Sequence, residues 1–164
     1  MSPTTASRAP ESRWSGEWDV RFWCDENGVE PVRAFLKNLK RREDRAKKLA
    51  VATAIERILK VYGTDVCLSE WGKNLGRGLY EFRIRHTAEE IERLFIASET
   101  EVGVSQPDSP SKVLIRIFFM TSGKQIILLL SGYDKGSSSS SRREQDEIER
   151  ARRLLTRAKA MARE

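Results

Sequence analysis

Residues 79–85 constrain the fold more than any other segment, because their side chains alternate without a break. Successive side chains of an extended strand point to opposite sides. One side carries Tyr80, Phe82 and Ile84, and the other carries Leu79, Glu81, Arg83 and Arg85. The apolar side needs a core to pack against. The segment therefore predicts a strand in a sheet that has one face in the interior and charged groups on the other.

Three further strands are predicted. Residues 18–22 alternate apolar and charged side chains, as in a half-buried strand. Residues 113–120 form a second clear strand, and residues 121–124 form a hairpin turn after it. Residues 126–130 are apolar on both faces, which is typical of a central strand.

Helical periodicity dominates between the first strand and Gly63. Pro31 stands at a first-turn position, where its missing N–H costs nothing, and opens a short helix. A polar break separates it from a longer helix over about residues 44–62, which Gly63 ends as a C-terminal cap. Another helix is predicted from about Arg142 to Met161. Residues 91–97 fit either a short helix or a strand.

The order of these elements predicts an α+β domain. Its helices, an N-terminal helical hairpin and a C-terminal helix, are expected to pack against one face of a curled, mainly antiparallel sheet. The length of 164 residues suits one domain with one core, which we place at residues 15–164. Residues 1–14 are predicted to be a disordered tail, residues 98–111 a loop insertion, and Gly132 to Ser141 a mobile connector that is serine-rich over residues 135–141.

The chain is basic, with a formal net charge of +6, and the surplus is concentrated in the helical hairpin. Residues 33–60 hold ten lysines and arginines against three acids. A basic surface favours a polyanionic partner, and nucleic acid is the first candidate. We therefore expect Arg41, Lys47 and Lys48 to contact nucleic acid, although many small soluble proteins are basic without such a partner.

Other classes of function find no support in the sequence. No apolar run approaches the roughly 20 residues that a membrane helix needs, and the polar N-terminus lacks a secretory signal. Cys24 and Cys67 do not have the spacing of zinc ligands, and we interpret them as reduced thiols of a cytoplasmic protein, with a disulfide left open. No glycine-rich phosphate loop is present. We expect neither a metal nor a cofactor.

Arginines on two strands are the first candidates for chemistry. Arg83 and Arg85 lie about 7 Å apart along one strand face, so both can address one phosphodiester. Arg116 stands inside an apolar strand, where its guanidinium needs a partner or a route to water. If its strand lies beside that of Glu81, Arg116 can pair with this carboxylate or join a phosphate site. A solvated strand face and a buried Arg–Glu pair are the structural alternatives.

A second group of candidates follows the strand at residues 126–130. Tyr133 can stack on a base or supply a phenol, and Lys135 can neutralise a phosphate. A turn with a solvated lysine is the alternative. His86 is the only histidine and the side chain best suited to proton transfer near neutral pH, although a lone histidine is more often structural.

Taken in order, these motifs resemble the phage-derived HigB-like toxins of the RelE superfamily. The resemblance runs from about residue 32 to residue 155. It rests on residues 78–85, Arg116 to Phe119, residues 127–130 leading into Gly132, Tyr133 and Lys135, and the helical segment Glu147 to Arg153.

The resemblance implies the toxin of a type II toxin–antitoxin system. Such toxins are endoribonucleases that need no metal and cleave mRNA, often on the ribosome, and a helix-turn-helix antitoxin holds them inactive. The RNA 2′-hydroxyl attacks the adjacent phosphate. Carried over by position, Arg83 and Lys135 stabilise the phosphate, with Arg116 as a second-rank candidate, and Tyr133 stacks on a base or assists proton transfer. Arg85 and His86 are additions specific to this chain.

Two departures weaken this catalytic inventory. Ser131 stands where related sequences often have a histidine or another polar group, and Gly136 stands where they often have a second basic residue. Residues 87–111 also look like an insertion between strands that a short hairpin normally joins. The competing hypothesis is therefore a non-catalytic RNA- or protein-binding regulator on the same fold.

Overall fold

The computed structural model describes residues 16–96, 113–137 and 140–163. In chain order these ranges form strand β1 (Asp19–Phe22), helices α1 (Pro31–Lys37) and α2 (Asp44–Ala54), a π-helical turn (Ile55–Leu59), helix α3 (Lys60–Tyr62), a 3-10 helix (Gly63–Leu68), strands β2 (Gly72–Gly76) and β3 (Leu79–Ile84), helix α4 (Ala88–Ile96), strands β4 (Ile115–Ser122) and β5 (Ile126–Asp134), and helix α5 (Ser141–Ala162). The predicted tail at residues 1–14 and the predicted loop at residues 98–111 lie outside the described residues.

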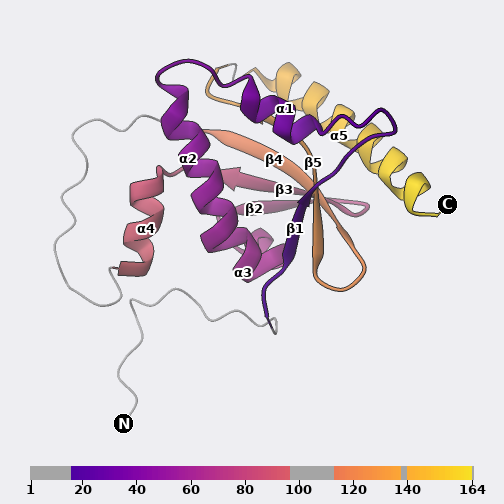
Figure 1. Ribbon diagram of the computed structural model, residues 1–164, viewed down its shortest axis with the longest axis horizontal. Helices are drawn as coiled ribbons and strands as arrows, with labels where there is room; N and C mark the ends of the chain where they lie inside the picture. Colours follow the sequence, from indigo (N-terminus) through magenta and orange to yellow (C-terminus); the bar gives the residue numbers. More distant parts are fainter. Residues whose placement is uncertain (1–15, 97–112, 138–139, 164) are drawn as a thin grey trace, which may run out of the picture.

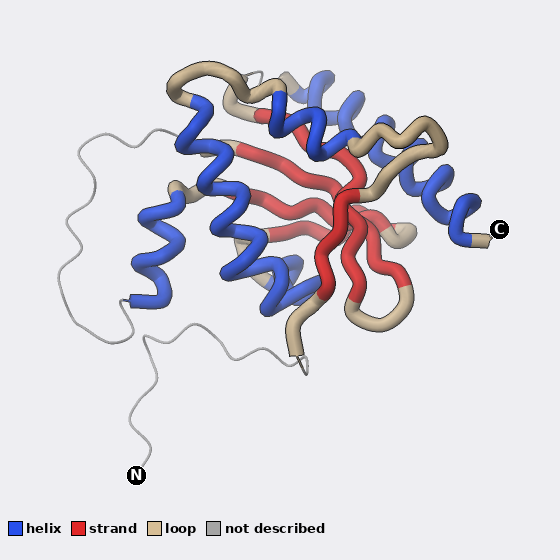
Figure 2. Tube along the Cα trace, viewed as in Figure 1, coloured by secondary structure: helices blue, strands red, loops and turns tan. Residues whose placement is uncertain are grey.

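The five strands form one open sheet in the order β1-β5-β4-β3-β2 (Figures 1 and 2). β1 runs parallel to β5, whereas the pairs β5–β4, β4–β3 and β3–β2 are antiparallel. The sheet is thus mixed but mainly antiparallel. Together with the helices it confirms the predicted α+β class.

Helices cover both faces of this sheet, whereas the sequence predicted them on one. On one side α1 packs on β5 and α2 on β3, with α4 beside α2 (Figure 1). On the other side α5 packs on β3, β4 and β5. The prediction was wrong because amphipathic periodicity shows that a helix has a buried face, but not which face of a sheet it covers.

Two apolar cores result, one on each face. The core beneath α1, α2 and α4 includes Val32, Val51, Leu59, Phe82, Ile84, Ile115, Ile117, Phe119, Ile127 and Leu129. The core beneath α5 includes Trp23, Leu79, Phe118, Met120, Leu130, Ala151, Leu154, Leu155 and Ala158. Alternate residues of one strand therefore enter different cores, as the period of two along a strand requires.

The N-terminal helices follow their sequence signals. Pro31 is the first residue of α1, as predicted. Residues 44–62 are helical throughout, although a π-helical turn interrupts the α-helical pattern at Ile55–Leu59. Gly63 ends this stretch with a φ of +54°, and a β-carbon there would overlap the indole ring of Trp18. Only glycine therefore lets the helix end this close to β1.

Three elements complete or correct the sequence assignment. Residues 91–97, which fitted a helix or a strand, belong to helix α4 through Ile96. β2 was not predicted, and it pairs with β3 through a hairpin in which both Arg77 and Gly78 have positive φ. β5 runs to Asp134, so the prediction of a flexible connector from Gly132 onward was wrong for its first three residues.

Two predictions about chain chemistry can be compared with the described residues. Cys24 and Cys67 are both free thiols. No helix in the described ranges is long and apolar enough to cross a membrane.

Candidate active site

Strand register brings three of the predicted site residues into one row. Arg83 of β3 lies opposite Arg116 of β4, and Arg116 lies opposite Tyr133 of β5. Directly opposed residues of neighbouring strands point to the same face of a sheet. In the next row Glu81, Phe118 and Ser131 are opposed in the same way. Two guanidiniums, a phenol, a carboxylate and a hydroxyl therefore share the face that α5 covers.

A β-bulge in β5 places Tyr133 on this face. Phe119 pairs with Leu129 but Phe118 pairs with Ser131, so Leu130 is an extra residue in β5. An extra residue reverses the alternation of every side chain that follows it. Without the bulge, Tyr133 would point toward α1 instead of standing beside Arg116. Bulges often redirect a side chain next to an active site.

Helix α5 adds charged side chains above this row. The guanidinium of Arg143 lies 5.7 Å from the centre of the Tyr133 ring and forms an ion pair of 3.3 Å with Glu147. Glu144 approaches the ammonium of Lys135 to 3.8 Å. We call the set Glu81, Arg83, Arg116, Ser131, Tyr133, Lys135, Arg143, Glu144 and Glu147 the polar cluster.

Four residues of the cluster are buried, and many of its buried polar atoms lack hydrogen-bond partners in the described part of the chain. The exposed fractions of Glu81, Arg116, Ser131 and Tyr133 are 1%, 2%, 0% and 1%. Six of its buried atoms have no hydrogen-bond partner among the described residues, namely Arg116 Nε and Nη1, Glu81 Oε2, Ser131 Oγ, Tyr133 Oη and Glu147 Oε2. Each such atom costs about 1–3 kcal/mol. A concentration of this kind is expected where a fold holds polar groups ready for a ligand rather than for its own stability.

One short ion pair organises the cluster, from Arg83 Nε to Glu81 Oε1 at 2.6 Å. Burial lowers the pKa of Arg116, and the charges of Arg83 and Arg85 lower it further, against the opposing effect of Glu81. Burial, with the charges of Glu81 and Glu144, raises the pKa of Tyr133 to about 12. Tyr133 therefore keeps its proton at neutral pH, so it can donate a hydrogen bond or a proton but cannot serve as a base.

The structure brings Lys135 and Arg85 near the same face. The backbone N–H of Lys135 donates to the carbonyl of Leu114 at 2.8 Å, which continues the pairing beyond β5, and its half-buried ammonium faces Glu144. Arg85 directly follows β3 and is exposed, and its charge reaches Arg116. Five predicted residues thus gather around the row: Arg83, Arg85, Arg116, Tyr133 and Lys135.

The structure places His86 apart from this group. Its ring nitrogens lie 2.8 Å from a carboxylate oxygen of Glu70 and 3.2 Å from one of Glu90, and its ring centre lies 5.2 Å from that of Trp71. Burial opposes the charged ring, but hydrogen bonds to the two glutamates outweigh it and raise the pKa of His86. None of these contacts belongs to the polar cluster. The geometry suits a structural role in which His86 joins Glu70 to Glu90 at the start of α4.

The three basic residues predicted from the helical hairpin, Arg41, Lys47 and Lys48, have different surroundings. The ammonium of Lys47 lies 2.6 Å from Asp134 and 3.4 Å from Asp44, so it ties α2 to the end of β5. The hydrogen bond to Asp134 is the main cause that raises the pKa of Lys47. Lys48 and Arg41 are exposed. Arg41 borders a pocket next to the cluster, whereas Lys48 does not.

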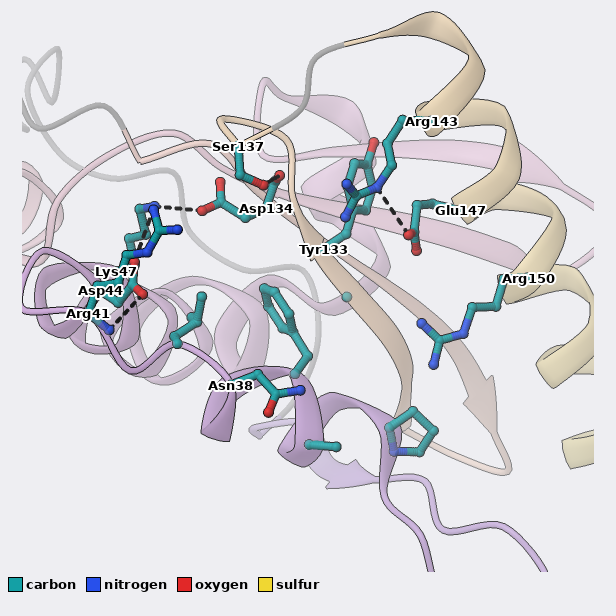
Figure 3. A pocket seen from close by; sticks show the side chains of 15 residues that line it. Asn38, Arg41, Asp44, Lys47, Tyr133, Asp134, Ser137, Arg143, Glu147 and Arg150 are labelled. Atoms are coloured by element: carbon teal, nitrogen blue, oxygen red, sulfur yellow. Dashed lines mark hydrogen bonds and ion pairs between the residues drawn. The ribbon is translucent and has the colours of Figure 1, made fainter.

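This pocket has a volume of about 410 Å³ and lies between α1, the end of β5 and α5 (Figure 3). Its lining consists of Pro31, Ala34, Phe35, Asn38, Leu39, Arg41, Asp44, Lys47, Gly132, Tyr133, Asp134, Ser137, Arg143, Glu147 and Arg150. Three of these, Tyr133, Arg143 and Glu147, also belong to the polar cluster. The pocket is therefore an open approach to one end of a covered site.

Sequence reasoning missed the α5 residues of the cluster and of the pocket. Arg143, Glu147 and Arg150 recur every three or four residues, the spacing of one helix face, and this spacing was available in the sequence. The ion pair between Arg143 and Glu147 was equally predictable as an i, i+4 pair. The spacing does not show which part of the sheet this face of α5 packs against. It gave no sign that charged residues would lie over Tyr133.

Comparisons with known proteins add no relative. No protein-family model matches this sequence, and no curated protein matches it either. Among the described residues, no three histidine, cysteine, aspartate or glutamate side chains converge in a way that would hold a metal ion. Function is therefore inferred from the geometry of the cluster and the pocket.

Proposed function

We propose that this chain is an endoribonuclease that cleaves single-stranded RNA at the polar cluster. The supporting observation is the row of Arg83, Arg116 and Tyr133, in which the buried donors of Arg116 and Tyr133 stand side by side without partners among the described residues, next to the Arg83–Glu81 ion pair. A phosphate that becomes pentavalent gains negative charge. Fixed donors in a dry site stabilise such charge far better than water does, and losing one costs about 100- to 1,000-fold in rate.

The reaction needs only side chains of this cluster. The 2′-oxygen of the RNA attacks the adjacent phosphorus, so that an O2′–P bond forms while the P–O5′ bond breaks. Glu81 has one oxygen on Arg83 and a second oxygen without a partner, and this second oxygen accepts the proton of the 2′-hydroxyl. Tyr133 gives its proton to the departing 5′-oxygen. After the step Glu81 releases its proton to solvent and Tyr133 takes one up from solvent, which restores both groups. The products are a 2′,3′-cyclic phosphate and a 5′-hydroxyl.

Access to the cluster requires movement of the first turns of α5. Residues 151–158 hold the four buried side chains of this helix, Ala151, Leu154, Leu155 and Ala158, whereas residues 141–150 hold none. The contacts of the first half with the sheet side are the ion pair of Glu144 with Lys135, the guanidinium of Arg143 over the Tyr133 ring and the half-buried Ile148, and ion pairs are weak where solvent reaches them. We infer that this half lifts while the second half stays anchored, which exposes Arg116 and Glu81 to RNA.

The biological setting that we propose is that of a type II toxin of the RelE and HigB kind, acting on mRNA in the cytoplasm. Its partners would be the ribosome and a helix-turn-helix antitoxin. The resemblance of the ordered motifs supports this setting. A neighbouring reading frame for a short helix-turn-helix protein would support it further.

The test is cleavage of single-stranded RNA by the purified protein, with and without ribosomes. The wild type should produce 2′,3′-cyclic phosphate ends, and Arg83→Ala should reduce the rate about 100-fold or more. Arg153→Ala is the matched control, because Arg153 is exposed on α5 and belongs to neither the cluster nor the pocket. A folded wild-type protein that leaves RNA intact in both conditions, and does not slow bacterial growth when expressed, refutes the proposal.

One observation favours a second candidate, a non-catalytic RNA- or protein-binding regulator. In the structure the cluster is covered by α5, and the Ser131 hydroxyl inside it has no partner within the described ranges, at a position where related toxins often carry a histidine or another polar group. This candidate predicts that the protein binds RNA or a protein partner with no cleavage of any substrate. The same experiment separates the two functions.

A further inference from the structure

We infer that the pocket between α1, the end of β5 and α5 is a nucleotide subsite, which binds the base and phosphate of the nucleotide next to the cleaved bond. Below, the pocket always means this site. The inference rests on the proposed function for the identity of RNA as the ligand. It adds a binding site whose residues are largely distinct from the polar cluster.

The pocket forms because β5 extends beyond the end of β1, its neighbouring strand. β1 pairs with β5 only over Ile126–Leu129, so residues 130–134 have a strand partner on one side only. Helix α1 borders this end on one face of the sheet and α5 on the other, which leaves a hollow between the two helices (Figure 3). A hollow at the end of a sheet, between covering helices, is a common location for a ligand site.

An aromatic ring forms part of the pocket wall. A β-carbon at Gly132 would lie 3.0 Å from Cδ2 of Phe35 and 3.3 Å from the carbonyl oxygen of Arg116. Glycine at this position therefore lets the Phe35 ring sit directly on the backbone of β5. The ring lies among Pro31, Ala34 and Gly132, which offer apolar surface beside it. Bases stack on such rings, and each stacked base contributes about 1–3 kcal/mol to binding.

Two cations of the pocket are available for phosphate. Lys47 is held by Asp44 and Asp134, and Arg143 by Glu147. Among the described residues, Arg41 and Arg150 make no ion pair through their side chains. They stand on opposite walls, Arg41 before α2 and Arg150 on α5 (Figure 3). A guanidinium binds two phosphate oxygens at once, which suits it to this role.

The pocket leads directly into the polar cluster. Tyr133, Arg143 and Glu147 line the pocket and belong to the cluster, so a nucleotide bound here presents its neighbouring phosphodiester to the end of the row. Asn38 projects its amide from the end of α1 (Figure 3). A side-chain amide offers a donor and an acceptor side by side, the pattern that reads a base edge.

RNA fits this pocket better than an added peptide strand. Gly132, Tyr133 and Asp134 are buried, so little of the β5 edge is open for the backbone pairing that strand addition needs. An aromatic ring that shares a pocket with two guanidiniums is instead typical of sites that bind single-stranded nucleic acid. The volume of about 410 Å³ also lies within the usual range for a small ligand.

The experiment measures binding of a short single-stranded 2′-O-methyl RNA to the full-length protein by fluorescence anisotropy. The methyl group blocks the attacking 2′-oxygen, so binding is observed apart from cleavage. The double variant Arg41→Glu, Arg150→Glu should bind at least about tenfold more weakly, with a salt dependence reduced by about one phosphate contact or more. The control is Arg45→Glu, Arg153→Glu, with the same charge change on exposed residues of α2 and α5 that do not line the pocket.

A second variant tests the aromatic wall without changing charge. Phe35→Leu keeps an apolar side chain but removes the stacking surface, and RNA should bind about five- to tenfold more weakly. Circular dichroism melting of each variant shows that it is folded. Equal losses in the pocket and control charge variants, or unchanged binding by Phe35→Leu, overturn the subsite. A third outcome is also informative. If the pocket and control charge variants lose RNA binding equally, but only the pocket variant loses binding to a protein partner, the pocket is a protein contact.

The outcome for the subsite is separate from that for the nuclease. If unmodified RNA is bound through the pocket but never cleaved, the subsite stands and the proposed activity fails. If RNA is cleaved normally by both pocket variants, the activity stands and the subsite fails.

Discussion

The two faces of the sheet are built from alternate residues of the same strands, yet they differ in how their polar groups are satisfied. Beneath α1, α2 and α4, the strands contribute an apolar core that includes Phe82, Ile117 and Leu129. Beneath the first half of α5 they contribute Glu81, Arg116 and Tyr133, with buried atoms that lack partners. The first face is arranged for stability, whereas the part of the second face beneath the first half of α5 holds charged groups at a cost to stability.

The comparison teaches that one strand can serve both purposes. In β3, Phe82 enters the apolar core, while Glu81 and Arg83 form the short ion pair of the cluster. Substitutions one residue apart should therefore have opposite consequences for folding and for chemistry. Four predictions test this contrast, in order of decreasing effect.

The largest effect is expected on the apolar face. Phe82→Ala removes a fully buried ring and leaves a cavity, so the free energy of unfolding should fall by about 3–5 kcal/mol. Urea denaturation measures the loss. Cleavage per folded molecule should stay near the wild-type rate, because the ring does not face the cluster. A stability loss below about 1 kcal/mol would show that this face is not the main core.

The second effect is expected on the polar face and has the opposite character. Arg116→Met keeps a long side chain but removes a guanidinium with two unpaired atoms, so cleavage should fall about 100- to 1,000-fold. The free energy of unfolding should be unchanged, or higher by up to about 2 kcal/mol, because unpaired buried donors destabilise the fold.

Rate measurements and urea denaturation of the same preparation check both parts of this prediction. Arg116→Lys is the control, since it keeps the charge but loses the planar donor geometry, and it should recover only part of the rate. If Arg116→Met is as destabilising as Phe82→Ala, Arg116 is a structural residue and the contrast between the faces is lost.

The two faces also differ in how far the sequence predicts them. The apolar face follows directly from alternation, because Tyr80, Phe82 and Ile84 mark one side of a strand whatever its neighbours are. The polar face requires the register between strands. Arg83, Arg116 and Tyr133 could be named as candidates from the sequence, but their alignment depends on the bulge at Leu130, for which the run of leucines gives no signal.

Short elements were harder to predict than long ones, for identifiable reasons. β2 has no apolar alternation, since Lys73 and Asn74 follow Gly72 in an edge strand that depends on the hairpin for its position. Helix α4 did have a signal. The hydroxyl of Thr87 accepts from the backbone N–H of Glu90, and Glu90 accepts from the backbone N–H of Thr87, which is a capping box readable in the sequence.

The third prediction concerns the cover over the polar face. Ser140 caps α5 by accepting a hydrogen bond from the backbone N–H of Arg143 at 3.1 Å. Ser140→Ala should weaken the first turn by about 1 kcal/mol. If residues 141–150 must lift before RNA enters, this change should raise cleavage up to about fivefold at limiting RNA, because a larger fraction of molecules is open. Hydrogen exchange of the first turn measures the opening directly. Faster exchange without faster cleavage would mean that the cover does not limit access.

The smallest effect is expected at His86, which lies outside the polar cluster. Its pKa is raised in the folded protein by Glu70 and Glu90, so folding favours the charged ring. The stabilisation is fully present below the unfolded pKa of about 6.5 and is lost as pH rises through the folded pKa. Because the ring is partly exposed, the contribution is about 0.2–1 kcal/mol.

Urea denaturation at about pH 5.5 and at about pH 8.5 tests this prediction against His86→Gln. The wild type should exceed the variant at the lower pH by this amount, and the difference should shrink at the higher pH. Glu90→Gln removes one carboxylate partner and should reduce the pH dependence without abolishing it, since Glu70 remains. Cleavage at a fixed pH should be similar in wild type and His86→Gln, because the contacts of His86 lie outside the cluster. A loss of rate comparable to that of Arg116→Met would instead bring His86 into the chemistry, and the division of labour between the two faces would need to be redrawn.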